Sequence, residues 1–130
     1  MSNLLQSLST SAAGLVAQAD RLNVVSQNIA NADTPGYQRK QVTFAEVMDN
    51  LSAPAKVTVE RITLDDSSLK QIHDPSHPLA NEQGFYDGSN VNLMLEMADS
   101  REAQRSYEAN LRSFENARQM SQSLLDLLRR

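Results

Sequence analysis

The sequence contains no cysteine and no tryptophan, and its 130 residues include only four glycines, four prolines and 5% aromatic residues. Without cysteine the chain forms no disulfide and no thiolate metal site. The scarcity of aromatic side chains leaves few large anchors for a globular core. No apolar run approaches the roughly 18 residues of a membrane span, so direct membrane insertion is not expected. The length indicates one domain.

Positive charge is also scarce. Twelve Lys and Arg stand against sixteen Asp and Glu, for a net charge of −4, and the basic residues are scattered among acids. Because phosphate binding needs a clustered positive face, nucleic-acid binding is not expected. A nucleophile elbow, a phosphate loop and a dinucleotide fingerprint are all missing from the sequence. No acid sits in a context that suggests burial, so the sequence predicts neither an enzyme nor a cofactor.

The N-terminal residues do not resemble a cleaved signal peptide. No Lys or Arg precedes Arg21, and polar residues interrupt every apolar run. This pattern fits a cytosolic protein, and it fits equally a protein that is exported without a cleaved signal.

A seven-residue repeat dominates the first part of the chain and comprises Met1, Leu8, Leu15, Leu22 and Ile29. Leu5 and Val25 fall on the same face, and Leu4, Ala12 and Ala19 widen it. The small side chains of Ala12, Ala13 and Ala19 would let a neighbouring helix approach closely. Such a seam is typical of a helix that packs on another helix. The repeat predicts a helix from about Leu4 to Ala30, roughly 40 Å long. Periodicity alone favours an ordinary amphipathic helix in a small bundle over an assembly helix.

The end of this helix is strongly signalled. Asn28, Asn31 and Asp33 can form local hydrogen bonds with the backbone. Thr34 precedes a proline and therefore avoids the helical region. Pro35-Gly36 suits the centre of a type II turn, which directs Tyr37 and the following strand.

Residues 37–89 change character and predict a small β and loop insert. Gln41–Phe44 and Lys56–Glu60 alternate polar and apolar residues, which indicates two strands forming a hairpin that lies on the helices. The face shifts near Arg61, as at a β-bulge. Residues 50–54 and 65–89 are interpreted as loops. His73 and His77 lie among prolines, which favours exposed turn histidines over a metal site.

A second helix is predicted from Asn92 to Leu128, where neither proline nor glycine occurs. Asn90 and Asn92 are its candidate N-caps. Tyr107, Leu111 and Phe114 are the expected packing anchors, opposite the leucine row of the first helix. The predicted fold is therefore mainly α. Residues 1–36 and 90–130 pair as an antiparallel coiled coil, and residues 37–89 are inserted between them within one domain.

Two segments resemble a known family. Residues 17–33 look like the N-terminal signature of flagellar rod and hook proteins. A second set of motifs closely resembles the proximal rod family FlgC: His77-Pro78-Leu79-Ala80, Gly84, Asn90-Val91-Asn92, Glu96-Met97 and Arg105-Ser106-Tyr107-Glu108-Ala109-Asn110. The short turn Thr34–Tyr37 is closer to the sister family FlgB, which remains an alternative. A cytoplasmic export chaperone or adaptor is the alternative from another class.

The resemblance implies a structural subunit of the proximal rod in the bacterial basal body, where a tube surrounds the export channel and transmits torque. It implies export by the flagellar type III apparatus without a cleaved signal, and assembly in the periplasm. The expected partners are further copies, rod proteins of the FlgB, FlgF and FlgG types, the adaptor FliE and the export apparatus. The residues expected to mediate assembly are Leu8, Leu15, Leu22, Val25, Ile29, Asn31, Pro35, Gly36, Tyr37, Arg105, Tyr107, Asn110, Leu111, Phe114, Leu125 and Leu128.

Overall fold

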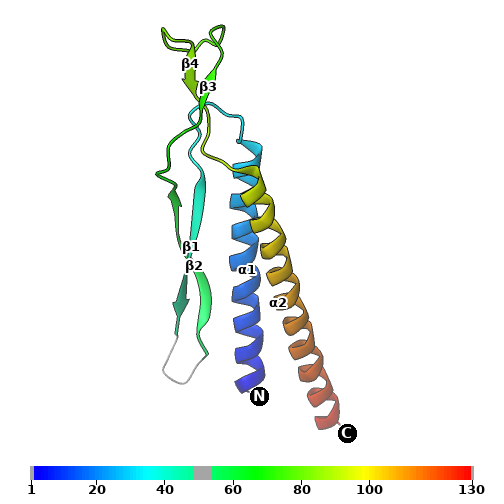
Figure 1. The fold of residues 1–130 in the computed structure, drawn as a ribbon. Coiled ribbons are helices and arrows are strands. Elements are labelled where there is room, and N and C mark those ends of the chain that lie inside the picture. The colour runs from blue at the N-terminus through cyan, green and yellow to red at the C-terminus, as the bar shows by residue number, and fades with distance from the viewer. Residues whose placement is uncertain (1, 49–53, 130) are drawn as a thin grey trace.

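The computed structural model describes residues 2–48 and 54–129, and it is built on two long antiparallel helices. Helix α1 spans Ser2–Ala30 and helix α2 spans Leu93–Leu128. Both ends of the chain lie at the same end of this pair (Figure 1). At 1.5 Å per residue α2 is about 54 Å long. The prediction of two long terminal helices is confirmed, while Met1 and the predicted loop at 50–53 lie outside the described residues.

The predicted hairpin is also confirmed. Strand β1 (Lys40–Val47) pairs antiparallel with β2 (Lys56–Leu64), and the hairpin runs along the side of α1 away from α2 (Figure 1). Thr43 pairs with Arg61 but Phe44 pairs with Val59, so Glu60 is the extra residue of a bulge. The shift of face expected near Arg61 is this bulge.

A second hairpin corrects the interpretation of residues 65–89 as a loop. Strands β3 (Gln71–His73) and β4 (Phe85–Asp87) pair antiparallel. With the residues between them they form a tip that projects beyond the helix pair (Figure 1). His77 stacks on Tyr86 with ring centroids 3.9 Å apart, and His73 meets the ring of Phe85. Strands of three residues are too short for an alternating pattern to reveal them.

The turn after α1 has the predicted form. The Tyr37 backbone N–H donates to the Thr34 carbonyl over 3.2 Å, and Gly36 has a φ of 71°. The N–H of Gly36 also donates to the carbonyls of Asp87 and Gly88, each over 3.1 Å. The turn therefore ties the end of α1 to the base of the tip.

The start of α2 distinguishes the two candidate caps. The Asn92 side chain accepts from the N–H groups of Met94 and Leu95, as an N-cap does. Asn90 instead accepts from the Arg39 N–H and donates to the carbonyls of Asp65 and Ser67. Asn90 thus fastens the start of β1 to the segment that follows β2.

Small residues, and not the predicted leucine row, form the buried centre of the helix pair. The buried apolar side chains in the described residues are Ala17, Val24, Val25, Ala103 and Ala117. Ile29 is 39% exposed and Leu111 is 37% exposed, so neither is a central anchor within this chain. Gly14 faces the Asn110 side chain across this contact, and a Cβ on Gly14 would lie 2.7 Å from the Asn110 amide nitrogen.

Candidate assembly site

A polar junction, defined here as Asn28, Tyr37, Arg39, Glu96 and Asp99, joins the end of α1, the start of β1 and the start of α2. Asn28 is 1% exposed. Its amide donates to the Lys40 carbonyl over 2.9 Å and to the Glu96 carboxylate over 3.1 Å. Its oxygen accepts from the Lys40 N–H and from the Tyr37 hydroxyl. Asn28 therefore bridges α1, β1 and α2, which goes beyond the local backbone bonds expected at the end of the helix.

Glu96 is the most unexpected member of this junction. Its side chain is fully buried, which contradicts the expectation that no acid is buried. The Arg39 guanidinium donates to one carboxylate oxygen and Asn28 donates to the other. A buried charge persists only when it is paired and hydrogen-bonded, and Glu96 meets both conditions.

The ion pairs continue outward from Arg39. Its guanidinium lies 3.2 Å from Asp99 and 3.8 Å from Asp65. Arg21 on α1 then reaches Asp99 over 3.2 Å and Glu102 over 3.5 Å. Hydrogen bonds from the backbone and side chain of Ser67, with a further contribution from Arg39, lower the pKa of Asp65. The junction is thus a structural clamp between α1, α2 and the hairpin, since its carboxylates are held by arginines.

Tyr37 gives a pH-dependent test of the junction. Burial first, and then the negative charge of Glu96, raise the pKa of the Tyr37 hydroxyl above its ordinary value. The fold favours the neutral phenol of Tyr37. The stability that this phenol contributes is complete at pH values below the pKa of Tyr37 in the unfolded chain. It is lost as the pH rises through the higher pKa of Tyr37 in the folded chain. In an ultraviolet titration of the tyrosines, we expect Tyr37→Phe to remove a step that lies at higher pH than an ordinary tyrosine, while the control Tyr107→Phe keeps this step. A high-pH step that is unchanged in Tyr37→Phe would contradict this assignment.

The structure distributes the residues expected to mediate assembly over three environments. Val25 is buried. The half-buried ones are Leu8, Leu15, Leu22, Asn31, Tyr37, Tyr107, Asn110 and Phe114. The exposed ones are Ile29, Pro35, Gly36, Arg105, Leu111, Leu125 and Leu128. Within the chain, Tyr37 meets Asn28 and Asn110 meets Gly14.

Sequence reasoning missed Arg39 and Glu96. One available signal was the spacing of Glu96, Ala103, Asn110 and Ala117, which lie seven residues apart on α2. Three of these four are buried, so this row faces α1.

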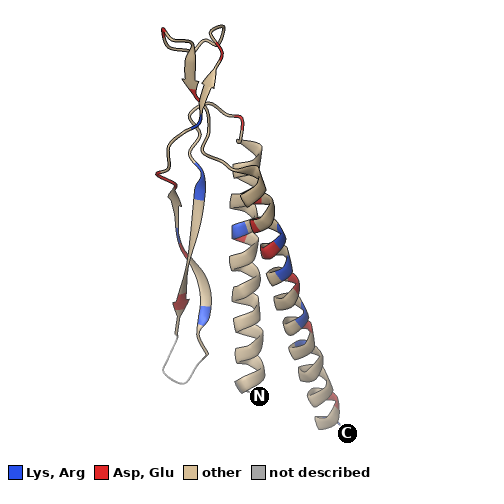
Figure 2. Cartoon of the chain, in the orientation of Figure 1, with Lys and Arg blue, Asp and Glu red and all other residues tan. Residues whose placement is uncertain are grey.

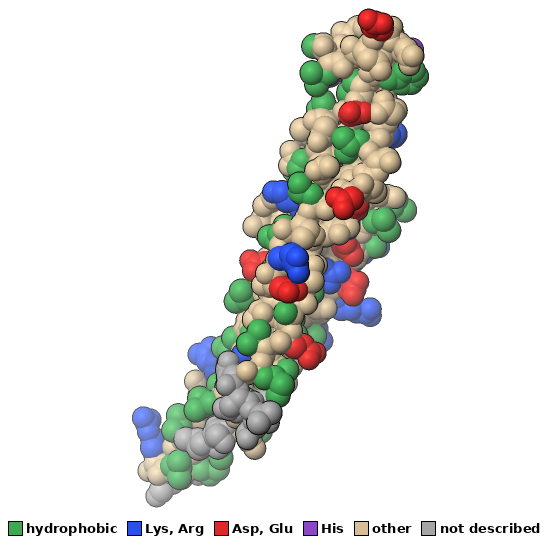
Figure 3. Space-filling view, turned by 90° about the vertical axis from the view of Figure 1, so that its left-hand side faces the viewer, with side chains coloured by type: hydrophobic (Ala, Val, Ile, Leu, Met, Phe, Trp, Pro, Cys, Tyr) green, Lys and Arg blue, Asp and Glu red, His purple; other side chains and the backbone are tan. Residues whose placement is uncertain are grey.

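Large apolar side chains remain exposed along both helices. On α1 they include Leu5 at 65% and Val16 at 62% exposure. Near the end of α2 a groove of about 580 Å³ is lined by Asn116, Gln119, Met120, Ser123, Leu124 and Leu127. Green side chains recur along the length of the molecule in Figure 3. Extended apolar surface on a small chain marks a site of contact with other macromolecules.

Charge is nearly absent from α1. Asp20 and Arg21 are its only charged residues (Figure 2). A helix surrounded by water usually carries many charged pairs on its outer face. The composition of α1 suits a helix enclosed by other protein.

Among residues 2–48 and 54–129, no group of three His, Cys, Asp or Glu side chains is placed to hold a metal ion. Neither described helix is long and apolar enough to cross a membrane.

Comparison with known proteins decides the family. A family model described as flagella basal body rod protein matches residues 8–38, and one described as flagellar basal body rod FlgEFG protein C-terminal matches residues 82–127. The flagellar basal-body rod protein FlgC of Agrobacterium fabrum is 43% identical over 123 residues, covering 89% of this chain and 88% of that protein. The chain belongs to the FlgC family. FlgC of Bacillus subtilis is 34% identical over 93% of this chain and 95% of its own length, and FlgC of Buchnera aphidicola is 33% identical over 96% and 98%.

Membership of the FlgC family confirms the resemblance carried by the two terminal motifs. It makes the chain a structural protein of the flagellar basal-body rod and not an enzyme. It also favours this interpretation over the FlgB and export-chaperone alternatives. The two matched segments contain most of α1 and α2, while β1 and β2 lie between them.

Proposed function

We propose that this FlgC-family chain polymerises into the periplasmic part of the flagellar rod through the outer faces of its two helices. The observation that carries the proposal is the exposed apolar surface along a helix pair of which one member is almost uncharged. Neighbouring subunits would bury this surface and gain about 25 cal/mol for each Å² removed from water. Identical head-to-tail contacts between successive subunits generate a helical tube.

The helix pair supports a coiled-coil interpretation of the assembled subunit. Glu96, Ala103, Asn110 and Ala117 repeat every seven residues on the face of α2 toward α1, as in a coiled-coil seam. We propose that residues 1–36 and 90–130 form the inner core of the rod around the export channel. Residues 37–89 then pack outward and transmit torque through parallel contacts.

The partners we propose are further copies, the FlgB, FlgF and FlgG rod proteins and the adaptor FliE. Export through the type III apparatus without a cleaved signal would deliver the chain to the periplasm. We further propose that packing against neighbouring subunits completes the ordering of α1. Because a helix gains most of its stability from packing, amide protection over residues 2–30 should be clearly lower in dilute monomer than in the assembled rod.

A single charge on α1 tests the assembly face. Leu22 is half-buried in the chain. An aspartate at this position would be enclosed without a partner once neighbouring subunits pack against it. Burying this unpaired carboxylate would cost several kcal/mol and oppose assembly. We expect Leu22→Asp to abolish swimming while the chain is still made. The matched control is Asn23→Asp, which places the same charge at an exposed position of the same helix and should leave swimming intact. Normal motility of Leu22→Asp would remove this face from the assembly.

A further inference from the structure

Two unpartnered apolar surfaces lie at opposite ends of α2. The first, the shoulder, consists of Leu93, Met94 and Met97, which are 48%, 78% and 51% exposed. It adjoins a groove of about 420 Å³ between the end of α1, the base of the tip and the start of α2. The groove is lined by Ala32, Asp33, Lys70, Ile72, Ser89, Val91, Asn92 and Leu93.

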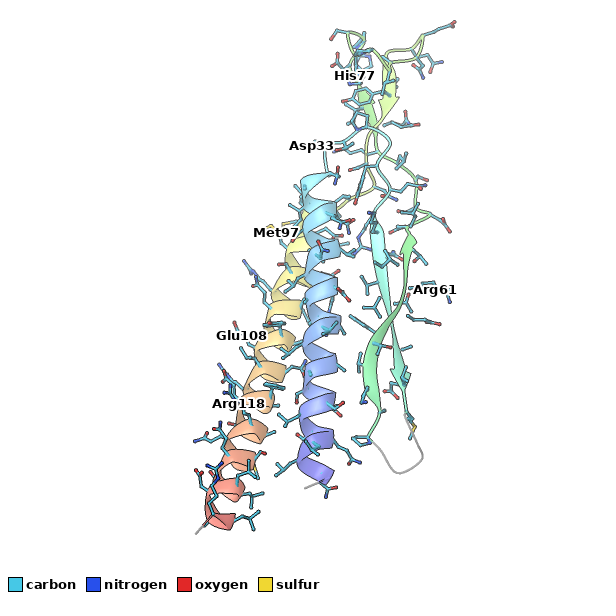
Figure 4. The ribbon with its side chains drawn as sticks, turned by 180° about the vertical axis from the view of Figure 1, so that it is seen from behind. Asp33, Arg61, His77, Met97, Glu108 and Arg118 are labelled. Carbon is cyan, nitrogen blue, oxygen red and sulfur yellow. The ribbon has the colours of Figure 1, made fainter. Side chains whose placement is uncertain are left out.

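The second surface, the tail, consists of Met120, Leu124, Leu127 and Leu128 in the last turns of α2. These side chains are 59%, 40%, 67% and 76% exposed. Leu93 and Leu127 are separated by about 50 Å along a straight helix, so the tail of one chain does not reach its own shoulder. Figure 4 shows Asp33 and Met97 at one end of the helix pair and Arg118 toward the other.

The two ends carry opposite charge. Residues 31–39 and 65–92, which form the turn, the tip and their connections, contain six acids and two bases. One of the two bases, Arg39, is engaged by Glu96 in the polar junction. Residues 116–129 contain the bases Arg118 and Arg129 and the single acid Asp126. Figure 2 shows acids predominating at the tip. The other base, Lys70, lines the groove together with Asp33. Asp33 is exposed and is the acid best placed to meet a base of an incoming tail.

We propose that the shoulder groove receives the leucine-rich, positively charged end of an α2-type helix from the next subunit along the rod. This chain's own tail has that chemistry. Leucines of the incoming helix would enter the groove and cover Met94 and Met97, and its Arg129 would face Asp33. The inference rests on the proposed function and names the contact that joins successive subunits.

The methionines of the shoulder suit this role. Methionine is flexible and polarisable, and it adapts to apolar partners of differing shape. An adaptable shoulder can close over the leucines of an incoming tail, and the Asp33 charge favours a helix end that carries a base.

Engineered disulfides test the contact directly, because the chain has no cysteine of its own. Purified full-length chain carrying Met94→Cys and Leu127→Cys should form intermolecular disulfides under mild oxidation. The control carries Met94→Cys and Glu108→Cys, since Glu108 lies on the exposed charged face in the middle of α2. We expect at least about tenfold more linked dimer from the first pair, in line with burial of leucine side chains. Equal yields from the two pairs would overturn the proposal.

A charge exchange tests the role of Asp33. In the background of the first cysteine pair, Asp33→Arg or Arg129→Asp alone should lower the yield about two- to fivefold, the range of an exposed ion pair. Mixing the two variants should restore it, because each shoulder then finds a tail of opposite charge. Arg112→Asp, an exposed change away from both surfaces, should have no effect. Unchanged yields in all variants would remove Asp33 from the contact.

The two proposals fail separately. If no cross-link forms but Leu22→Asp still abolishes swimming, the shoulder contact is wrong and the rod assignment stands. If Leu22→Asp swims normally, the proposed assembly face is wrong whatever the cross-linking shows.

Discussion

Arg39→Met is expected to destabilise the fold by about 3–5 kcal/mol, one of the two largest effects anticipated for a single substitution in this chain. The reason is Glu96, whose carboxylate is fully buried and accepts from Arg39. Without the guanidinium, the donor that this carboxylate keeps among residues 2–48 and 54–129 is the neutral amide of Asn28. A buried charge left without its partner costs far more than an exposed pair contributes. Urea denaturation followed by circular dichroism measures the loss.

The double variant Arg39→Met, Glu96→Met separates the charge from the packing. Replacing both partners by apolar side chains removes the desolvated charge, so most of the lost stability should return. Arg105→Met, at an exposed position of α2, is the matched control and should change stability by less than about 0.5 kcal/mol. If the double variant is as unstable as Arg39→Met alone, Glu96 is not the reason for the loss.

Gly14→Val is expected to separate the two helices and to lower stability by about 1–3 kcal/mol. Even a Cβ on Gly14 would lie 2.7–2.8 Å from three atoms of the Asn110 side chain. The two methyl groups of valine extend further, so the helices must move apart or Asn110 must leave the seam. The melting temperature and the protection of amides in α1 and α2 report this change.

The control for this substitution is Ala19→Val. It introduces the same β-branched residue into the same helix at an exposed position, and so accounts for the weaker helix propensity of valine. Asn110→Gly in the Gly14→Val background should recover part of the packing. Equal losses from Gly14→Val and Ala19→Val would show that close approach at Gly14 does not hold the helices together.

The elements that the sequence predicted correctly are those with local causes. The Thr34–Tyr37 turn follows from the properties of proline and glycine. The Asn92 cap follows from hydrogen bonds between its side chain and backbone N–H groups two and three residues further on. The β1–β2 hairpin follows from alternation over adjacent segments. Each signal lies within a few residues of the structure it specifies.

The polar junction could not be predicted because its partners are distant along the chain. Asn28 and Glu96 are 68 residues apart, and Arg39 and Glu96 are 57 apart. No local pattern shows that a glutamate in the first turn of α2 will be covered by an arginine that immediately precedes β1. The predicted leucine row was misleading for a related reason. A helix that packs on more than one partner carries more than one apolar stripe, and periodicity does not reveal which stripe meets which partner.

The α1–α2 contact and the outer apolar surface have different roles in the proposed assembly. The small residues at the α1–α2 contact let the two helices approach closely, while larger residues such as Leu5, Val16 and Leu127 remain outside. Assembly would cover that outer surface. In this account, the polar junction fixes how the hairpin and the tip leave the helix pair, so neighbouring subunits meet a defined surface.

Cell fractionation tests the central claim, incorporation into the rod after export, most directly. The chain carrying an epitope tag is followed in isolated hook–basal bodies, periplasm and cytoplasm, with and without the ATPase of the flagellar export apparatus. We predict that the chain copurifies with basal bodies when the ATPase is present, and that it accumulates in the cytoplasm when the ATPase is absent. A chain that stays in the cytoplasm of cells with a working export apparatus, and is missing from their basal bodies, would contradict the account.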